Sequence, residues 1–232
     1  MRSPFALRAR SLFAALLLVG CNTSLTNIDP DPIDGGVDQA QALSITPPEQ
    51  SVTVNQQPVT ARFSARLDGD VTATADWSLS DSSFGMVTAG GVTVPATLSV
   101  GGTVQVTARV GDKSGSARLN VKVVSADLLG PGVAGSATGA FTGAATGAAP
   151  QIVYPFNGAM LARNINGMRL MWRSVTGATL YRVVLDTPGL QQSIYLGTQS
   201  CPGGECTYVV DDKLWDRVAR GSTGAVTVRI AA

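Results

Sequence analysis

Apolar residues recur at every second position along much of this chain, and this period of two limits what the chain can fold into. Between positions 43 and 124 four segments show it: 60–67, 75–79, 103–110 and 117–123. Successive side chains of a β-strand point to opposite faces, so each segment predicts a strand with one buried face. Turn-forming pairs such as Asp68-Gly69 and Gly90-Gly91 lie between them. Short strands separated by such turns predict antiparallel sheets that share a core, a β-sandwich.

The same alternation returns between positions 151 and 232. The segments that show it are 168–173, 181–186 and 226–230. The intervening residues 125–150 are rich in Gly, Ala and Thr, with glycine at every fourth position from Gly135 to Gly147. This spacing is also typical of membrane-helix interfaces, but polar residues interrupt the apolar run of about 20 that a membrane helix needs. The sequence therefore predicts an all-β protein, with two β-sandwiches joined by a flexible linker.

Three stretches of the first region resemble a known family. They are "ADWSLSD" (75–81), "GMVTAGG" (85–91) and "GGTVQVTARVGDKSGSARLNVKV" (101–123). Together they are similar to the bacterial immunoglobulin-like domain, group 2. The resemblance implies an immunoglobulin-like β-sandwich over 43–124, with Trp77 as its core tryptophan. The segment 92–100 is longer than the family pattern expects.

Two stretches of the second region resemble a fibronectin type III module. They are "PQIVYPFNGAML" (150–161) and "MRLMWRSVTGATLYRVVL" (168–185). The resemblance implies an immunoglobulin-like sandwich over 151–232, with Trp172 in its core. Such a module has one more strand after "AVTVRIAA" (225–232), and "LWDRVARG" (214–221) replaces its usual tyrosine-bearing corner. Three explanations stay open: a truncated sequence, which we favour, an open-edged module, or one miscounted strand.

The N-terminus has the pattern of a secretory signal peptide over residues 1–20. Three arginines precede a ten-residue apolar run, 11–20, which is too short to cross a bilayer. "LVGC" (18–21) resembles the bacterial lipobox, and this resemblance implies lipid attachment at Cys21 with cleavage just before it. By the sorting rule of that family, Asn22 in place of aspartate implies the outer membrane. Residues 21–42, with four aspartates and two prolines, are expected to be the lipidated N-terminus and a flexible tether.

Composition argues against several classes of function. Removing residues 1–20 takes away three of the 17 Lys and Arg and none of the 16 Asp and Glu, which leaves a net charge of −2. A weakly charged chain without a Lys/Arg cluster is not expected to bind nucleic acid. The chain has no histidine, which removes the commonest general base and the commonest metal ligand. We therefore expect no enzyme activity, no cofactor and no metal site.

The two remaining cysteines, Cys201 and Cys206, flank a Pro-Gly-Gly turn. In an exported protein this spacing predicts a disulfide, which would stabilise the fold by about 2 kcal/mol on the chain-entropy model. Three aromatic residues of the second region, Trp215, Tyr195 and Tyr208, are the candidate ligand contacts.

We expect from these observations a lipoprotein of the cell envelope, held in the membrane through Cys21, that acts as a non-enzymatic adhesion, scaffold or spacer module. Its expected partners are the membrane and either another envelope protein or a glycan. Two alternatives stay open: a carbohydrate-binding surface module, and the stalk of a longer surface enzyme truncated at residue 232.

Overall fold

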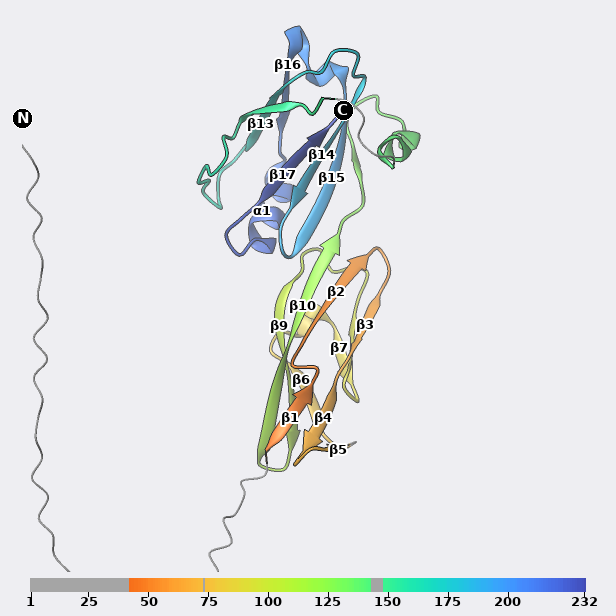
Figure 1. Ribbon diagram of the computed structural model, residues 1–232, viewed down its shortest axis with the longest axis vertical. Helices are drawn as coiled ribbons and strands as arrows, with labels where there is room; N and C mark the ends of the chain where they lie inside the picture. Colours follow the sequence, from red (N-terminus) through yellow and green to blue (C-terminus); the bar gives the residue numbers. More distant parts are fainter. Residues whose placement is uncertain (1–41, 73, 143–147) are drawn as a thin grey trace, which may run out of the picture. The chain divides into compact units, whose positions relative to one another are not determined.

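The computed structural model describes residues 42–72, 74–142 and 148–232, and these residues are mostly β-strand (Figure 1). They all belong to one compact unit. The all-β architecture expected from the alternation is confirmed. The signal peptide expected at 1–20, the lipid site at Cys21 and the tether up to residue 41 lie outside the described residues.

The first lobe, residues 43–124, contains ten strands and one short 3-10 turn. Their bounds are β1 Leu43–Thr46, β2 Glu49–Asn55, β3 Val59–Arg62, β4 Ser64–Leu67, β5 Asp70–Thr72, β6 Asp76–Leu79, η1 Ser82–Phe84, β7 Met86–Thr88, β8 Gly91–Val94, β9 Gly102–Val110 and β10 Lys113–Val124. They form the ladders β1-β4-β5, β3-β8-β7 and β2-β10-β9-β6. The long strand β10 pairs antiparallel with β9 and parallel with β2.

The core of this lobe is built from the alternating residues that define the strands. Val106 and Leu119 are fully buried, and Phe63 is 5% exposed. The neighbours of Val106 and Leu119 along β9 and β10 are more exposed, because a strand presents alternate side chains to opposite faces. Trp77, expected in the core, is only partly buried and packs against it from β6.

The second lobe holds the remaining strands and the α-helix. The bounds are β11 Leu128–Leu129, η2 Gly135–Phe141, β12 Gln151–Tyr154, β13 Arg169–Arg173, β14 Leu180–Asp186, β15 Leu190–Gly197, η3 Thr198–Ser200, η4 Pro202–Gly204, β16 Glu205–Val209, α1 Asp212–Gly221 and β17 Thr227–Ala231. One sheet has the order β12-β13-β16, and the other has the order β17-β14-β15, with β11 beside β15. Trp172 and Tyr181 are both 1% exposed, with ring centroids 5.7 Å apart, and they join the two sheets across the core.

The stretch 214–221, which departs from the fibronectin pattern, forms most of α1. Its apolar residues Leu214, Trp215, Val218 and Ala219 fall on one helical face and are buried. Asp211 caps the helix by accepting hydrogen bonds from the backbone N–H groups of Lys213 (2.9 Å) and Leu214 (3.3 Å).

Part of the segment expected to be a flexible linker is built into the second lobe. Strand β11 pairs parallel with β15. Phe141 of η2 stacks against Tyr195 with ring centroids 5.8 Å apart, and the Arg182 guanidinium lies 5.2 Å from the centre of its ring. Residues 143–147 lie outside the described residues.

The last residues of β10 pair with strand β15 of the second lobe. Val123 and Val124 pair parallel with Leu190 and Gln191 of β15. Backbone hydrogen bonds link Gly101 N–H (2.9 Å) and Val123 N–H (3.1 Å) to the carbonyl oxygen of Gly189. We refer to these contacts as the β10–β15 junction. The sequence predicted a linker between separate sandwiches and did not reveal this direct pairing.

Candidate functional site

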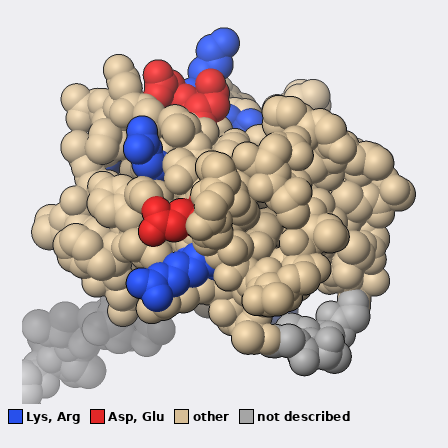
Figure 2. All heavy atoms as spheres, turned by 90° about the horizontal axis from the view of Figure 1, so that it is seen from above, with Lys and Arg blue, Asp and Glu red and all other residues tan. Residues whose placement is uncertain are grey.

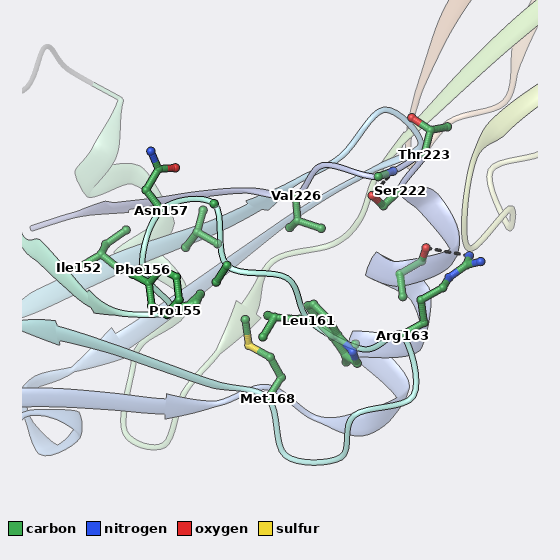
Figure 3. A pocket seen from close by; sticks show the side chains of 16 residues that line it. Ile152, Pro155, Phe156, Asn157, Leu161, Arg163, Met168, Ser222, Thr223 and Val226 are labelled. Atoms are coloured by element: carbon green, nitrogen blue, oxygen red, sulfur yellow. Dashed lines mark hydrogen bonds between the residues drawn. The ribbon is translucent and has the colours of Figure 1, made fainter.

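A cavity of about 640 Å³ lies in the second lobe, between β12 with the loop that follows it, α1 and the start of β17 (Figure 3). Its apolar walls are formed by Ile152, Pro155, Phe156, Ala159, Leu161, Met168, Trp215, Ala219, Val226 and Val228. The other lining residues are Asn157, Gly158, Arg163, Ser222, Thr223 and Gly224. Arg163 is the single charged residue among them. The volume and apolar lining are those of a binding cavity, which typically measures about 300–1,000 Å³.

The loop between β12 and β13 is held over α1 by three hydrogen bonds that are distributed along the helix. Arg163 Nη2 donates to the carbonyl oxygen of Ala219 at 3.1 Å, and Trp215 Nε1 donates to that of Ala162 at 3.3 Å. At the other end of the helix, the backbone N–H of Gly167 donates to the Asp212 carboxylate at 2.9 Å. These contacts fix the guanidinium of Arg163 at the helix end of the cavity.

The wall formed by β17 is incompletely covered. Val183 and Leu185, on the neighbouring strand β14, are fully buried. Val228 and Ile230 pair with these two residues across the ladder but remain partly exposed, as does Val226 just before β17. Among the described residues β17 pairs only with β14, so its other edge has no strand beside it. We call this edge together with the cavity the β17 groove.

The opposite wall exposes large apolar side chains. Phe156 lines the cavity with 70% of its surface exposed, and Met160 in the same loop is 98% exposed. The alternation pattern did not identify these residues, because they lie in a loop. The available signal is the density of apolar residues in "IVYPFNGAML" (152–161), a stretch punctuated like a loop by proline and glycine.

The three aromatic residues expected to contact a ligand lie on separate elements. Trp215 on α1 lines the cavity but is only 4% exposed, and Tyr195 on β15 is 3% exposed and packs against Phe141. Tyr208 on β16 is partly buried; burial raises the pKa of its phenol, and the negative charge of Asp211 raises it further. Of the three rings only that of Trp215 lines the cavity, and the rings of Trp215 and Tyr195 are almost fully buried. The predicted Cys201–Cys206 disulfide is confirmed.

Charged side chains are sparse on the face shown in Figure 2, where both signs occur. Among the described residues no three His, Cys, Asp or Glu side chains gather closely enough to hold a metal ion. The described part of the chain also contains no helix long and apolar enough to cross a membrane. The cavity itself is lined by apolar and uncharged side chains apart from Arg163.

The fold and the groove define an all-β protein of β-sandwich lobes with one apolar, strand-edged cavity. No protein-family model matches the chain, and no curated protein matches it. Among solved structures, a chimeric titin Z1Z2 functionalized with a KLER exogenous peptide from decorin is similar over 74% of this chain and 82% of that chain. The sequence identity is 19% and the TM-score is 0.27. At this TM-score the likeness supports no argument about this chain.

Proposed function

We propose that this chain is a non-enzymatic spacer or scaffold module of the cell envelope, anchored to the outer membrane by a lipid on Cys21. The β10–β15 junction is the observation that carries the proposal. A spacer must transmit position from its anchored end to its far end, and direct strand pairing between lobes does this better than a flexible connector. In this role the chain requires no cofactor, and its partners are the membrane and other envelope proteins.

Close backbone approach at the junction supports this role. A Cβ atom added to Gly189 would lie 2.5 Å from the carbonyl oxygen of Gly101, nearer than real Cβ contacts come. The Gly101 N–H donates to the Gly189 carbonyl oxygen at 2.9 Å in the same place. The two glycines thus allow the backbones of both lobes to meet without intervening side chains.

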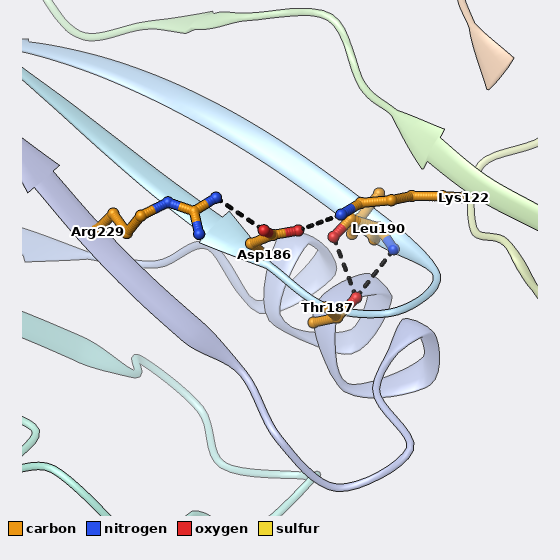
Figure 4. A network of polar contacts seen from close by, with 5 residues as sticks. All are labelled: Lys122, Asp186, Thr187, Leu190 and Arg229. Carbon is orange, nitrogen blue, oxygen red and sulfur yellow. Dashed lines mark hydrogen bonds and ion pairs between the residues drawn. The ribbon is translucent and has the colours of Figure 1, made fainter. Parts of the chain in front are cut away.

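Side chains add ionic contacts across the junction (Figure 4). The Asp186 carboxylate accepts from Lys122 Nζ of the first lobe at 2.6 Å and from Arg229 Nη2 of β17 at 2.7 Å. Nearby, Arg217 of α1 donates to Ser125 Oγ at 2.7 Å and to Gln192 Oε1 at 3.0 Å. Residues of β10, the segment after it, β14, β15 and α1 therefore converge on this one region.

The spacer proposal is tested by measuring the distance between lobes. Nitroxide labels at the exposed positions Ser114→Cys and Arg173→Cys, in a chain that also carries Cys21→Ser, would report it by double electron–electron resonance. We expect a single narrow distance distribution. Gly189→Ala should broaden it, whereas Gly139→Ala should not, because a Cβ at Gly139 would meet nothing within 4 Å. A broad distribution in the parent protein would refute the spacer role.

The anchor is tested separately in the native host. Cys21→Ser should move the protein from the membrane fraction to the soluble fraction and remove the lipid mass from its N-terminal peptide. The matched control is the double variant Cys201→Ser/Cys206→Ser, which should stay in the membrane with its lipid mass unchanged. If the Cys21→Ser protein remains membrane-bound, the lipid anchor is wrong while the spacer role of the lobes still stands on the distance measurement.

The alternative of a carbohydrate-binding module does not gain support from Trp215 or Tyr195. Sugar-binding surfaces stack an exposed aromatic face on the sugar ring, and Trp215 and Tyr195 are both buried.

A further inference from the structure

We propose that Asn157 is a modification site, where the side-chain amide reacts with water, without an enzyme, to give isoaspartate and aspartate. The reaction passes through a cyclic imide that Asn157 forms with the backbone nitrogen of Gly158. Asn166, which also precedes a glycine, is protected from the same reaction by Asp212. This inference goes beyond the spacer role and does not depend on it. Both asparagines lie in the loop between β12 and β13, so their contrast needs nothing from the outer edge of β17.

The sequence offers two sites for this chemistry, Asn157-Gly158 and Asn166-Gly167. Every other asparagine of the chain is followed by a residue that has a side chain. Glycine is the least hindered residue in this position, because it has no Cβ beside its nitrogen and its backbone turns freely. The sequence alone therefore gives two equal candidates, and only their surroundings in the fold separate them.

The reaction joins two groups that are neighbours along the chain. The Gly158 nitrogen attacks the side-chain carbon Cγ of Asn157, a bond forms between these two atoms, and the Cγ–Nδ2 bond breaks. The amide proton of Gly158 leaves with the Asn157 amide group as ammonia. Water then opens the imide at either of its two carbonyl carbons, and the resulting acid loses a proton at neutral pH. Water is the only co-reactant, and nothing is oxidised or reduced.

At Asn157 neither reacting group is held by a hydrogen bond. Asn157 and Gly158 are exposed, and within the described part of the chain neither the Asn157 side chain nor the Gly158 N–H has a hydrogen-bond partner. The two residues are the centre of a β-turn, closed by a hydrogen bond from the Ala159 N–H to the Phe156 carbonyl oxygen at 3.0 Å. Only the outer residues of such a turn share its closing bond, so the Gly158 nitrogen stays available.

At Asn166 the attacking nitrogen is held in place. The Gly167 N–H donates to the carboxylate of Asp212, the first residue of α1, at 2.9 Å. Hydrogen bonds to a charged acceptor are stronger than neutral ones, and this one must break before the nitrogen can turn toward Cγ. The nitrogen must also lose its proton to become a good nucleophile, and the adjacent negative charge opposes that loss. Asp212 therefore slows the reaction at Asn166 in two ways.

Modification of Asn157 changes the rim of the cavity. Asn157 lies at one end of the lining and Arg163, its single charged residue, lies at the other (Figure 3). The new carboxylate gives the uncharged end a negative charge. Isoaspartate also adds a methylene to the main chain of the turn, which disrupts its closing hydrogen bond. Phe156 and Ala159, which share that bond, both line the cavity, so its wall changes shape as well as charge.

Timed incubation of the full chain at mildly alkaline pH tests the proposal. In water enriched in heavy oxygen, peptide mapping by mass spectrometry counts the conversions at each asparagine. Each rate is divided by the rate at the same site in concentrated urea, which removes the effect of the preceding residue, Phe156 or Ile165. We expect this ratio to be at least about tenfold higher for Asn157 than for Asn166. Ratios within about twofold of each other, or a lower ratio at Asn157, would overturn the proposal.

Asp212→Ala isolates the cause of the protection. It removes the acceptor of the Gly167 N–H, so it should raise the rate at Asn166 at least about fivefold and leave the rate at Asn157 within about twofold. Asp216→Ala, at an exposed position of the same helix, is the matched control and should change neither rate. If Asn166 reacts no faster in folded Asp212→Ala, protection by Asp212 is wrong. The comparison within the parent protein stands even if this variant does not fold.

The effect on the rim has its own readout. Loss of the closing hydrogen bond should speed amide hydrogen exchange at Ala159 at least about threefold in the aged protein relative to the fresh protein. Asn157→Gln, whose longer side chain closes the imide ring far more slowly, should show no such change on ageing. Unchanged exchange at Ala159 in converted protein would refute the effect on the cavity wall.

Discussion

Thr187 closes the turn between β14 and β15 with three hydrogen bonds to one residue. Its hydroxyl donates to the carbonyl oxygen of Leu190 at 3.1 Å and accepts from the Leu190 N–H at 2.9 Å, and its own N–H donates to that carbonyl at 2.8 Å (Figure 4). The residue is 4% exposed, so water cannot replace these bonds. The turn also presents Gly189 to the first lobe.

Thr187→Val keeps the shape of the side chain but removes its hydroxyl. It leaves the buried Leu190 N–H without a partner, and we expect the free energy of unfolding to fall by about 1–3 kcal/mol. Urea denaturation followed by circular dichroism measures this. Thr227→Val, at an exposed strand position with no side-chain hydrogen bond to lose, should change stability by less than about 0.5 kcal/mol. Equal effects would mean that the hydroxyl is not used.

Asp186 gives stability a dependence on pH. Burial raises the pKa of its carboxyl, but hydrogen bonds from Lys122 and Arg229 and their positive charges outweigh burial, so the pKa is lowered. A carboxyl with a depressed folded-state pKa stabilises the fold above its unfolded pKa of about 3.9 and loses this contribution as pH falls through the folded value.

The stabilisation from Asp186 is expected to disappear in acid. At pH 7, Asp186→Asn should be less stable than the parent by about 1 kcal/mol. The gap should narrow below about pH 4 and close once pH falls below the lowered pKa. Denaturation midpoints measured from pH 7 to pH 2 would show this. Asp112→Asn, whose side chain is 85% exposed, should match the parent at pH 7. A constant gap at all pH values would contradict the proposed cause.

At the scale of elements, helix α1 depends on the residue just before it, Asp211, for a defined start. Asp211 accepts from two backbone N–H groups that would otherwise have no partner, and its negative charge lies at the positive end of the helix. The helix presents Trp215 to the cavity. The cap therefore also fixes one wall of the β17 groove.

Asp211→Ala should lower the free energy of unfolding by about 1 kcal/mol, because the two N–H groups lose their acceptor. It should also increase the accessibility of Trp215 to a fluorescence quencher. Asp216→Ala is the matched control: Asp216 is exposed and pairs with Arg220 four residues on, so its loss should cost only about 0.3–0.5 kcal/mol. If the control proved as destabilising as Asp211→Ala, the capping explanation would fail.

The sequence predicted most elements whose side chains alternate and missed those fixed by long-range contacts. The strands around Leu119, Trp172 and Val183 follow directly from the period of two, because apolar residues occupy alternate positions in the sequence and are the ones that become buried. Strand β11 has two exposed leucines and exists because β15 is beside it. The sequence marks 214–221 only as a departure from the tyrosine-bearing corner of the fibronectin pattern, although its apolar residues have helical spacing.

The candidate site was less predictable than the fold. Trp215, one of the candidate ligand contacts, lines the cavity but is almost fully buried there. The groove is formed where β12, a loop, α1 and β17 come together, and residues such as Arg163 and Ala159 carry no local signal of this. A cavity is a property of packing between segments distant in sequence, so single-sequence patterns do not show it.

At the scale of the whole molecule, the β10–β15 junction should couple the unfolding of the two lobes. Gly189→Ala would place a Cβ 2.5 Å from the Gly101 carbonyl oxygen and force the strands apart. We expect one calorimetric transition in the parent protein and two resolved transitions in this variant. Gly139→Ala should keep the single transition. Two transitions in the parent protein would show that the lobes melt independently.

The parallel pairing of β2 with β10 has a mechanical consequence. Seven residue pairs, from Glu49–Arg118 to Asn55–Val124, join β2, which follows the short first strand β1, to β10, the strand by which the chain leaves the first lobe. Tension applied along the chain pulls these two strands in opposite directions along their common axis. The backbone hydrogen bonds between β2 and β10 are then loaded in shear. They must break nearly simultaneously, and not one after another. A tethered molecule with this arrangement resists stretching at the pair of strands β2 and β10.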